Sequence, residues 1–156
     1  MKKVLIALDY DPSSLKVAEK GYAMAKKMGA QVVVMHVLSE PVYYSSLEYS
    51  PIMGFNHFMS MNTVQIDTAK EVKKAAQHFL DSTKTHLKDE TIKTLIKEGE
   101  TAVSILESAA SLHADIIVLG THSRKWLENI LLGSVAESIL KDSTIPLFII
   151  PTKKKD

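Results

Sequence analysis

The 156-residue sequence predicts an α/β protein with an open parallel sheet and helices on both of its faces. Short continuous apolar runs, such as Val4 to Leu8, are typical of strands that are buried on both sides. Segments with apolar residues at helical spacing alternate with these runs along most of the chain. Because parallel strands need crossovers, and crossovers are right-handed, this alternation favours one sheet that is covered on both faces.

Two strands and one helix are predicted in the first 38 residues. The strand Val4 to Leu8 is followed by a helix, for which Asp11 is the expected cap and Pro12 the expected first residue. Gly29 ends the helical spacing of apolar residues. The second buried strand is Val32 to Leu38, which is rich in β-branched residues.

Residues 39–63 interrupt the alternation and have no clear periodicity. They are rich in aromatic residues and methionines, which are Tyr43, Tyr44, Tyr49, Met53, Phe55, Phe58, Met59 and Met61. The segment is long for a plain connection, so a lid, a partner surface or a partly helical excursion is expected. A surface loop that folds down its own side chains is the alternative.

The second half of the chain is predicted to contain three further helices and three further strands. In order they are a helix over 66–87, a strand over 91–96, a helix over 102–112, a strand over 115–119, a helix from Ser134 and a strand over 145–150. Gly99 separates the second of these strands from the helix that follows it. The expected order of elements is therefore βαβαβαβαβ.

Composition excludes several classes of function. The net charge of +1, with basic residues spread along the chain, does not predict a nucleic-acid-binding surface. The absence of cysteine rules out disulfides, thiolate metal sites and cysteine nucleophiles, and it suits a reducing compartment. The first apolar run is too short for a signal peptide or a membrane span. We therefore expect a cytoplasmic protein with no membrane or nucleic-acid partner.

The segment Gly120 to Ser134, GTHSRKWLENILLGS, has a glycine near each end and contains the only arginine, Arg124. If Gly120 turns the chain after a strand and Gly133 precedes a helix, the first free amides of that helix point toward the crevice. Ser134 and Arg124 would then bind phosphate oxygens. The alternative is structural, because Ser134 and Glu137 have the spacing of a capping box.

These residues resemble the universal stress protein family over nearly the whole chain, residues 39–63 excepted. The spacing Gly120-x-x-Ser123, nine residues, Gly133-Ser134 is similar to the family's nucleotide motif, Gly-x-x-Gly, nine residues, Gly-Ser/Thr. The first strand ending at Asp9, the words DIIVLGTHS and LLGSVAESIL, and the short last strand match as well. The resemblance implies a single domain over 1–152, with a lysine-rich tail over 153–156.

The resemblance also implies a strand order of 3-2-1-4-5 and, in the nucleotide-binding branch, ATP between the first and fourth strands. Asp9 would lie at the ribose or adenine side, the Val37 backbone would bond adenine, and Gly133 would approach the phosphates. The residues expected to bind the nucleotide are Leu8, Asp9, Val37, Gly120, Thr121, His122, Ser123, Arg124, Gly133, Ser134 and Val135. Any Mg²⁺ would be held mainly by the phosphates.

Ser123 stands where the family's motif has its second glycine. Serine there costs about 1 kcal/mol or more if the position needs positive φ, and its Cβ crowds a nearby phosphate, whereas its hydroxyl adds a hydrogen bond. Some family members lack the glycines and do not bind ATP. Two functions stay open: an ATP-binding regulatory or sensor module of the stress response, and a nucleotide-free protein that acts through its dimer and partner surfaces.

Catalysis has little support in the sequence. Asp9 and Asp11 after a strand also resemble a phosphatase of the haloacid dehalogenase type, but no acidic pair follows the fourth strand. The six histidines show no metal-ligand spacing, and His122 alone falls in the expected phosphate loop. Trp126 is expected to anchor that loop. We therefore expect no catalytic or metal-binding residue, and at most slow ATP hydrolysis.

The last strand, over 145–150, is apolar and lies at a sheet edge in the implied order. Its free backbone groups are available to a second copy, and family members pair in this way, so a homodimer is expected.

Overall fold

The computed structural model describes residues 1–39, 65–121 and 132–152. The elements in chain order are β1 (Lys3–Ala7), α1 (Ser14–Lys27), β2 (Gln31–Leu38), α4 (Gln65–Leu87), β3 (Lys93–Glu98), α5 (Thr101–Ser111), β4 (Ile116–Gly120), α6 (Ser134–Asp142) and β5 (Leu147–Ile150). The aromatic and methionine-rich segment 39–63 and the centre of the glycine-bracketed segment lie outside the described residues, apart from Ser39.

The five strands form one sheet in the order β3-β2-β1-β4-β5, and every pair of neighbours is parallel. This confirms the predicted open parallel sheet and its strand order. β1 is central: Leu5 lies opposite Val33 of β2 on one side and Ile117 of β4 on the other. From β1 the chain first continues to β2 and β3 on one side, and it later forms β4 and β5 on the other side. The strand order therefore reverses between β1 and β4.

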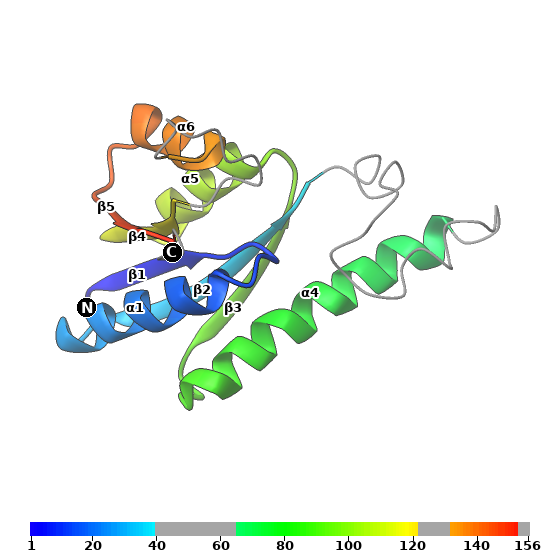
Figure 1. The fold of residues 1–156 in the computed structure, drawn as a ribbon, viewed down its shortest axis with the longest axis horizontal. Helices are drawn as coiled ribbons and strands as arrows, with labels where there is room; N and C mark the ends of the chain where they lie inside the picture. Colours follow the sequence, from blue (N-terminus) through cyan, green and yellow to red (C-terminus); the bar gives the residue numbers. More distant parts are fainter. Residues whose placement is uncertain (40–64, 122–131, 153–156) are drawn as a thin grey trace, which may run out of the picture.

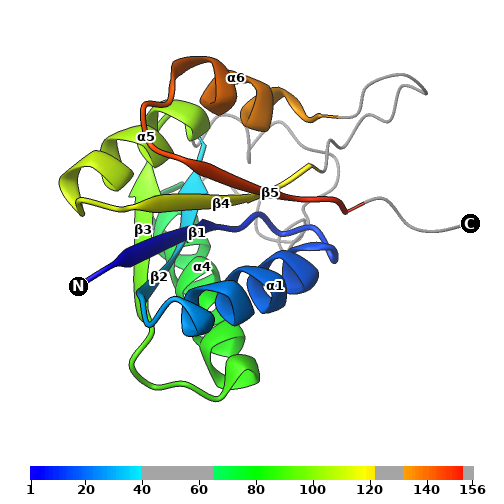
Figure 2. The ribbon, with the colours of Figure 1, turned by 90° about the vertical axis from the view of Figure 1, so that its left-hand side faces the viewer.

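Helices cover both faces of this sheet, with α1 and α4 on one face and α5 and α6 on the other (Figures 1 and 2). Alternate residues of each strand therefore enter two separate cores. On β1, Val4 and Ile6 pack on the α1 side, whereas Leu5 packs on the α5 side, and all three are fully buried. A strand buried on both faces needs apolar residues at consecutive positions, as the sequence shows.

α1 begins two residues later than Asp11 and Pro12 predicted. Its first residue is Ser14 and its N-cap is Ser13, which makes no capping bond through its side chain. Asp11 instead holds the turn before the helix: its carboxylate accepts the Ser13 amide at 2.9 Å, and its carbonyl accepts the Ser14 amide at 2.9 Å. An aspartate two residues before a turn amide favours this local bond over a helix cap.

Gly29 ends α1 as predicted, and it does so in the left-handed region, with φ of 64°. The Gly29 amide donates to the Lys26 carbonyl at 3.1 Å, and the Ala30 amide donates to the Ala25 carbonyl at 3.0 Å. This pair of bonds is a Schellman motif, which satisfies carbonyls at the helix end and favours glycine at the residue after the cap.

Two edge strands and one strand end differ from the sequence prediction. β3 covers 93–98 rather than 91–96, and β5 begins at Leu147 rather than Ile145. Ile145 is held in a turn, because the Ser143 hydroxyl donates to its carbonyl and accepts from its amide. Gly120 is the last residue of β4, where turning of the chain was expected. Short edge strands have few burial constraints, so their apolar pattern defines their ends poorly.

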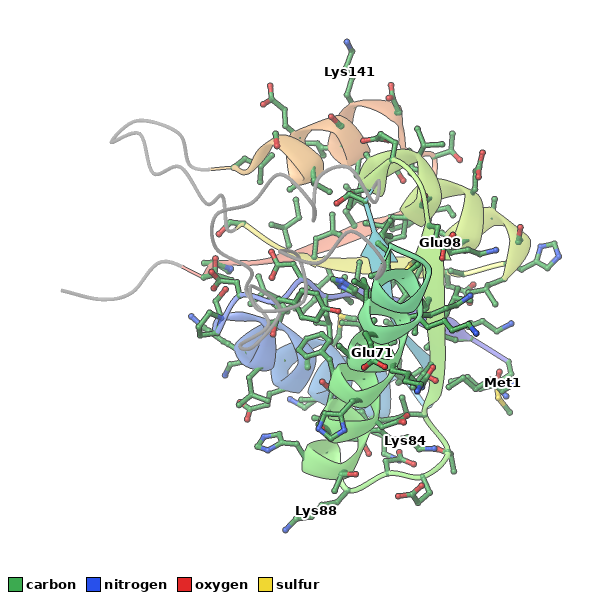
Figure 3. All side chains as sticks on the ribbon, turned by 90° about the vertical axis from the view of Figure 1, so that its right-hand side faces the viewer. Met1, Glu71, Lys84, Lys88, Glu98 and Lys141 are labelled. Carbon is green, nitrogen blue, oxygen red and sulfur yellow. The ribbon has the colours of Figure 1, made fainter. Side chains whose placement is uncertain are left out.

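α4 is a long helix that crosses the sheet face and extends past the top of β2 (Figure 1). Its apolar side packs on the sheet, with Val72, Ala76 and Leu80 buried. Charged side chains lie on its other sides, among them Glu71 and Lys84 (Figure 3). The buried Val72 and Ala76 pack with Leu38, so α4 covers one side of the sheet at the carboxyl end of β2.

Gly21 lets α1 lie close to the sheet, and its replacement by valine is expected to destabilise the fold. A Cβ at Gly21 would come within 2.9 Å of Val118 Cγ1 and 3.0 Å of Ile6 Cδ1, both in the fully buried core. Overpacking of this kind costs about 2 kcal/mol of unfolding free energy. Chemical denaturation measures the loss, with Ala23→Val as a matched control at an exposed position of α1. Equal stability losses in both variants would contradict the close packing.

Candidate functional site

The carboxyl ends of β1, β2 and β4 lie at one edge of the sheet. Parallel sheets bind ligands there, beyond the strand ends at the point where the strand order reverses, which in this chain lies between the paired strands β1 and β4. β1 is followed by Leu8 and Asp9, and β4 ends at Gly120 and is followed by Thr121. The fold therefore brings the residues after these strands to one edge, as the sequence analysis predicted.

Leu8 joins β1 to β2 beyond the last residue of its strand. Its amide donates to the Met35 carbonyl at 2.9 Å, and its carbonyl lies 2.7 Å from Nδ1 of His36. The side chain of Leu8 is buried in the core on the α1 side, so only its backbone reaches the edge. Asp9 is exposed directly after it, and its carboxylate accepts the Asp11 amide at 3.1 Å.

Val37 offers its backbone at the same edge. Backbone groups along a strand point alternately to its two neighbours, and the Met35 carbonyl points to β1 because it accepts the Leu8 amide. The Val37 amide and carbonyl therefore point to the β1 side as well, beyond the rung that Leu8 makes. The Val37 side chain is buried on the α5 side of the sheet, which leaves the backbone as its polar contribution.

Gly133 is the N-cap of α6, and Ser134 is the first residue of the helix. The capping-box alternative is therefore wrong, because a capping box needs Ser134 itself at the N-cap. Gly133 has φ of −69° and ψ of 160° and no side chain with which to cap. Gly133 therefore gives no side-chain cap to the amides of the first helical turn, beginning with Ser134 and Val135, which carry the positive end of the helix dipole.

A backbone hydrogen bond closes the base of the glycine-bracketed segment. The Gly133 amide donates to the Thr121 carbonyl at 3.0 Å, which holds the start of α6 beside the end of β4. His122, Ser123, Arg124 and Trp126 lie between these two ends and outside the described residues. The structure therefore brings Gly120, Thr121 and Gly133 together with Ser134 and Val135, and the roles expected of the other four stay predictions.

Neither bracketing glycine is required by its backbone conformation. Among the described glycines, positive φ occurs at Gly29 and Gly99, so Gly120 and Gly133 have angles that other residues adopt readily. Of the two reasons for glycine, positive φ and close approach to the main chain, only the second applies at these positions. Gly133 is buried and Gly120 is partly buried. Each of the two glycines therefore leaves room beside the main chain, either for a ligand or for a neighbouring group of the protein.

His36, one of the six histidines without metal-ligand spacing, is buried. Its ring packs on Tyr10 and Phe79, with centroids 4.2 and 5.9 Å away. The contact with the Leu8 carbonyl requires Nδ1 to donate, while Nε2 is buried and has no hydrogen-bond partner within the described part of the chain. Burial lowers the pKa of His36, although the Leu8 carbonyl and the Asp9 charge oppose the shift. The ring is therefore neutral at pH 7.

Asp9 and Asp11 hold the turn between β1 and α1. The Asp9 carboxylate accepts the Asp11 amide and the Asp11 carboxylate accepts the Ser13 amide. Within the described ranges, no three His, Cys, Asp or Glu side chains lie close enough to hold a metal ion. These bonds give both aspartates a structural role, and the phosphatase alternative gains no support from their surroundings.

A helix that could cross a membrane is not found in the described parts of the chain.

Comparison with known proteins agrees with this geometry. The family model described as Universal stress protein family matches residues 1–151. Universal stress protein MJ0531 of Methanocaldococcus jannaschii is 31% identical over 162 residues, which covers 99% of this chain and 85% of that protein. Universal stress protein YxiE of Bacillus subtilis is 27% identical over 150 residues, covering 95% of this chain and 97% of that protein.

Solved structures share the fold. The hypothetical protein MJ0577, from Methanocaldococcus jannaschii, superposes with a TM-score of 0.73 at 23% identity, covering 99% of this chain and 98% of that chain. A universal stress protein in complex with cAMP superposes with a TM-score of 0.58 at 18% identity, covering 97% and 98% of the two chains. At these identities the likeness concerns the arrangement of the elements.

The stability of the protein is expected to fall on acidification because of His36. A folded-state pKa below the ordinary value of 6.5 means that the unfolded chain binds the proton first as the pH falls through that value. Denaturant unfolding between about pH 7.5 and about pH 5 measures the loss. In His36→Asn, where an amide replaces the Nδ1 donor, this pH dependence is expected to become shallower.

The matched control is His78→Asn, which removes an exposed imidazole from α4. It is expected to keep the steeper pH dependence of the wild type. If His36→Asn follows the wild-type curve throughout the acid range, the buried imidazole is not the group that titrates.

Proposed function

Because the chain belongs to the universal stress protein family, we propose that it is an ATP-binding regulatory or sensor module of the stress response. The observation that carries this proposal is the start of α6, where a buried glycine with ordinary backbone angles takes the place of a side-chain cap. The uncapped amides of a helix N-terminus favour anionic groups such as phosphate. The amides at the start of α6 lie beside the end of β4, at the carboxyl ends of the strands.

The phosphate end of the nucleotide is proposed to lie between the end of β4 and α6. Gly120 and Gly133 have no Cβ, so phosphate oxygens can approach the main chain at both positions. The amides of Ser134 and Val135, with the Ser134 hydroxyl, are the proposed donors. Arg124 is proposed to add a forked contact to the phosphates, together with His122 and Ser123.

The adenine end is proposed to lie at the tops of β1 and β2. Adenine presents a donor next to an acceptor along its edge, and the Val37 carbonyl and amide offer the complementary pair on the β1 side. Asp9 is exposed directly after Leu8 at the same edge and would accept from a ribose hydroxyl. A nucleotide with its adenine and phosphates in these two places would lie across the carboxyl ends of β1 and β4, where the strand order reverses.

Binding rather than turnover is the proposed activity. The carboxylates of Asp9 and Asp11 each accept a backbone amide of the turn between β1 and α1, which gives them a structural role. Mg²⁺ is proposed to arrive with the phosphates rather than to occupy a site of its own. Phosphoryl transfer also needs a positioned water or base, so hydrolysis is proposed to be slow at most.

The comparison structures support an adenine nucleotide in particular. One of them is a universal stress protein in complex with cAMP, which contains adenine, ribose and a phosphate. The nucleotide-free alternative rests on Ser123, which stands in place of a motif glycine. In that case the protein would act through its dimer and partner surfaces.

We also propose that the protein is a homodimer paired through β5. The two edges of the sheet differ in chemistry: β3 carries Lys93, Lys97 and Glu98, whereas β5 is the uncharged sequence LFII. Charges on an edge strand oppose pairing with another sheet, so β3 is protected and β5 is not. Phe148 of β5 is 37% exposed, which adds apolar area at that edge.

The wild-type protein is expected to release or absorb heat when ATP is titrated into it. Gly133→Val is expected to weaken binding at least about tenfold, because the side chain occupies space near the phosphates. Ser123→Gly is expected to bind at least as well as the wild type. Isothermal titration calorimetry measures all three, and AMP and cAMP titrations test whether the outer phosphates contribute.

Gly133→Ala is the control for folding, since the angles of Gly133 allow an alanine. Denaturation curves of both Gly133 variants separate a loss of stability from a loss of binding. A wild-type protein that gives no heat at millimolar ATP would favour the nucleotide-free alternative.

Ile149→Pro is expected to convert the dimer into monomers. The carbonyl of Pro146, directly before β5, accepts from β4, and the carbonyl of Ile150 accepts from Thr121 directly after β4, so by alternation the Ile149 amide points away from the sheet. Proline removes this outward donor and spares the bonds to β4. Sedimentation velocity measures the change, and Ile149→Ala, which keeps the amide, is expected to remain dimeric. A wild type that is monomeric at micromolar concentration would contradict the pairing.

A further inference from the structure

The hydrogen-bond ladder between β4 and β5 ends in an unusual way. The Thr121 amide donates to the Ile150 carbonyl at 3.1 Å, as the next rung after Gly120 requires. The Thr152 amide then donates to the side-chain oxygen Oγ1 of Thr121, also at 3.1 Å. The two hydroxyl oxygens are 3.3 Å apart, so one hydroxyl also donates to the other.

Parallel register predicts a different acceptor for the Thr152 amide. In a parallel pair, the amide of one residue donates to a carbonyl of the neighbouring strand. The carbonyl of that same residue then accepts the amide that lies two residues further along the neighbouring strand. Since Thr121 donates to Ile150, Thr152 should donate to the Thr121 carbonyl. In the structure the hydroxyl of Thr121 replaces its own carbonyl in this rung.

The replaced carbonyl serves another element. It accepts the Gly133 amide at 3.0 Å, so one residue binds β5 through its side chain and the start of α6 through its main chain. A carbonyl that stayed in the ladder would point along the sheet toward β5 and would be directed away from α6. The hydroxyl of Thr121 thus allows the chain to leave the sheet without leaving the Thr152 amide unsatisfied.

We propose that Thr121 is a positioning residue, whose hydroxyl completes the β4–β5 ladder and frees its carbonyl to fix the first turn of α6. The proposal deepens the proposed function, because it concerns the same phosphate-binding amides. Through Thr152, the segment directly after β5 then contributes to holding Ser134 and Val135 in place, although it is not proposed to contact the nucleotide.

Thr121→Val tests the role of the Thr121 hydroxyl, because both partners of Thr121 are buried. Thr152 is buried, with 7% of its surface exposed, and Gly133 is buried as well. In Thr121→Val the shape of the side chain is kept but the acceptor is lost. The Thr152 amide then competes with the Gly133 amide for the carbonyl of Thr121. Competition weakens the bond of a buried donor, so the first turn of α6 is expected to be held less firmly in this variant.

Amide hydrogen exchange followed by NMR, in the absence of nucleotide, tests the positioning role directly. In Thr121→Val the Gly133 amide is expected to exchange at least about fivefold faster than in the wild type, while amides in β1 and β2 keep their rates. Thr121→Ser, which retains the hydroxyl, is expected to restore slow exchange. Thr94→Val is the matched control, since it removes a threonine hydroxyl bonded to Gln77 at the opposite edge of the sheet.

Calorimetric titration of the same proteins with ATP tests the link to the phosphates. Thr121→Val is expected to bind ATP about fivefold more weakly than the wild type, and Thr94→Val to bind like the wild type. Unchanged exchange at Gly133 in Thr121→Val overturns the proposal. So does faster exchange with unchanged ATP affinity. A wild type that does not bind ATP overturns the proposed function instead, and the exchange rates still decide whether Thr121 fixes α6.

Discussion

The structure depends on one constraint: in a parallel sheet that is buried on both faces, backbone polar groups remain unpaired only at strand ends and edges. Within β1, Val4 to Ile6 are completely buried, and β2 and β4 bond to both sides of that strand. No polar chemistry fits between the layers without a large cost in desolvation. The chain must therefore place any ligand-binding group at the carboxyl edge, where the strands end and the helices begin.

The contacts at that edge show how the chain leaves the sheet without stranding buried donors. On the β1 side, the Leu8 amide continues the ladder to Met35, and the His36 ring covers the Leu8 carbonyl. On the β4 side, Thr121 divides its acceptors between β5 and α6. In both places a side chain takes over a bond that the main chain would otherwise make. The Leu8 carbonyl and the Thr152 amide thereby keep hydrogen-bond partners at the strand ends.

The same edge is asymmetric in its electrostatics. Asp9 lies on the β1 side, and the α6 side has the positive end of a helix dipole with no acidic cap at the N-cap position. α5, in contrast, begins at Glu100, whose carboxylate accepts the amides of Ala102 and Val103 at 3.2 and 2.7 Å. Two helices on one face therefore begin differently: α5 is capped by the side chain of its N-cap residue, whereas the N-cap residue of α6 has no side chain.

Much of the fold was accessible from the sequence because burial on both faces forces consecutive apolar residues at 4–8 and 32–35, and because the left-handed ending of α1 favours glycine at position 29. The family's motif likewise located Gly120 and Gly133. Local sequence could not decide whether Ser134 caps α6 or opens it, since the SVAE spacing suits both. The extended backbone of Gly133 and the bond from the Glu137 amide to its carbonyl place the N-cap at Gly133.

The ends of the edge strands, the burial of His36 and the contact between Thr121 and Thr152 were decided by tertiary structure alone. They join residues that are distant in sequence, such as Thr121 and Thr152 or Leu8 and His36, and no local periodicity encodes such pairs. Sequence determined which faces must be buried, because that is a property of each segment. Only the assembled sheet determined which polar groups would be left over at its edge.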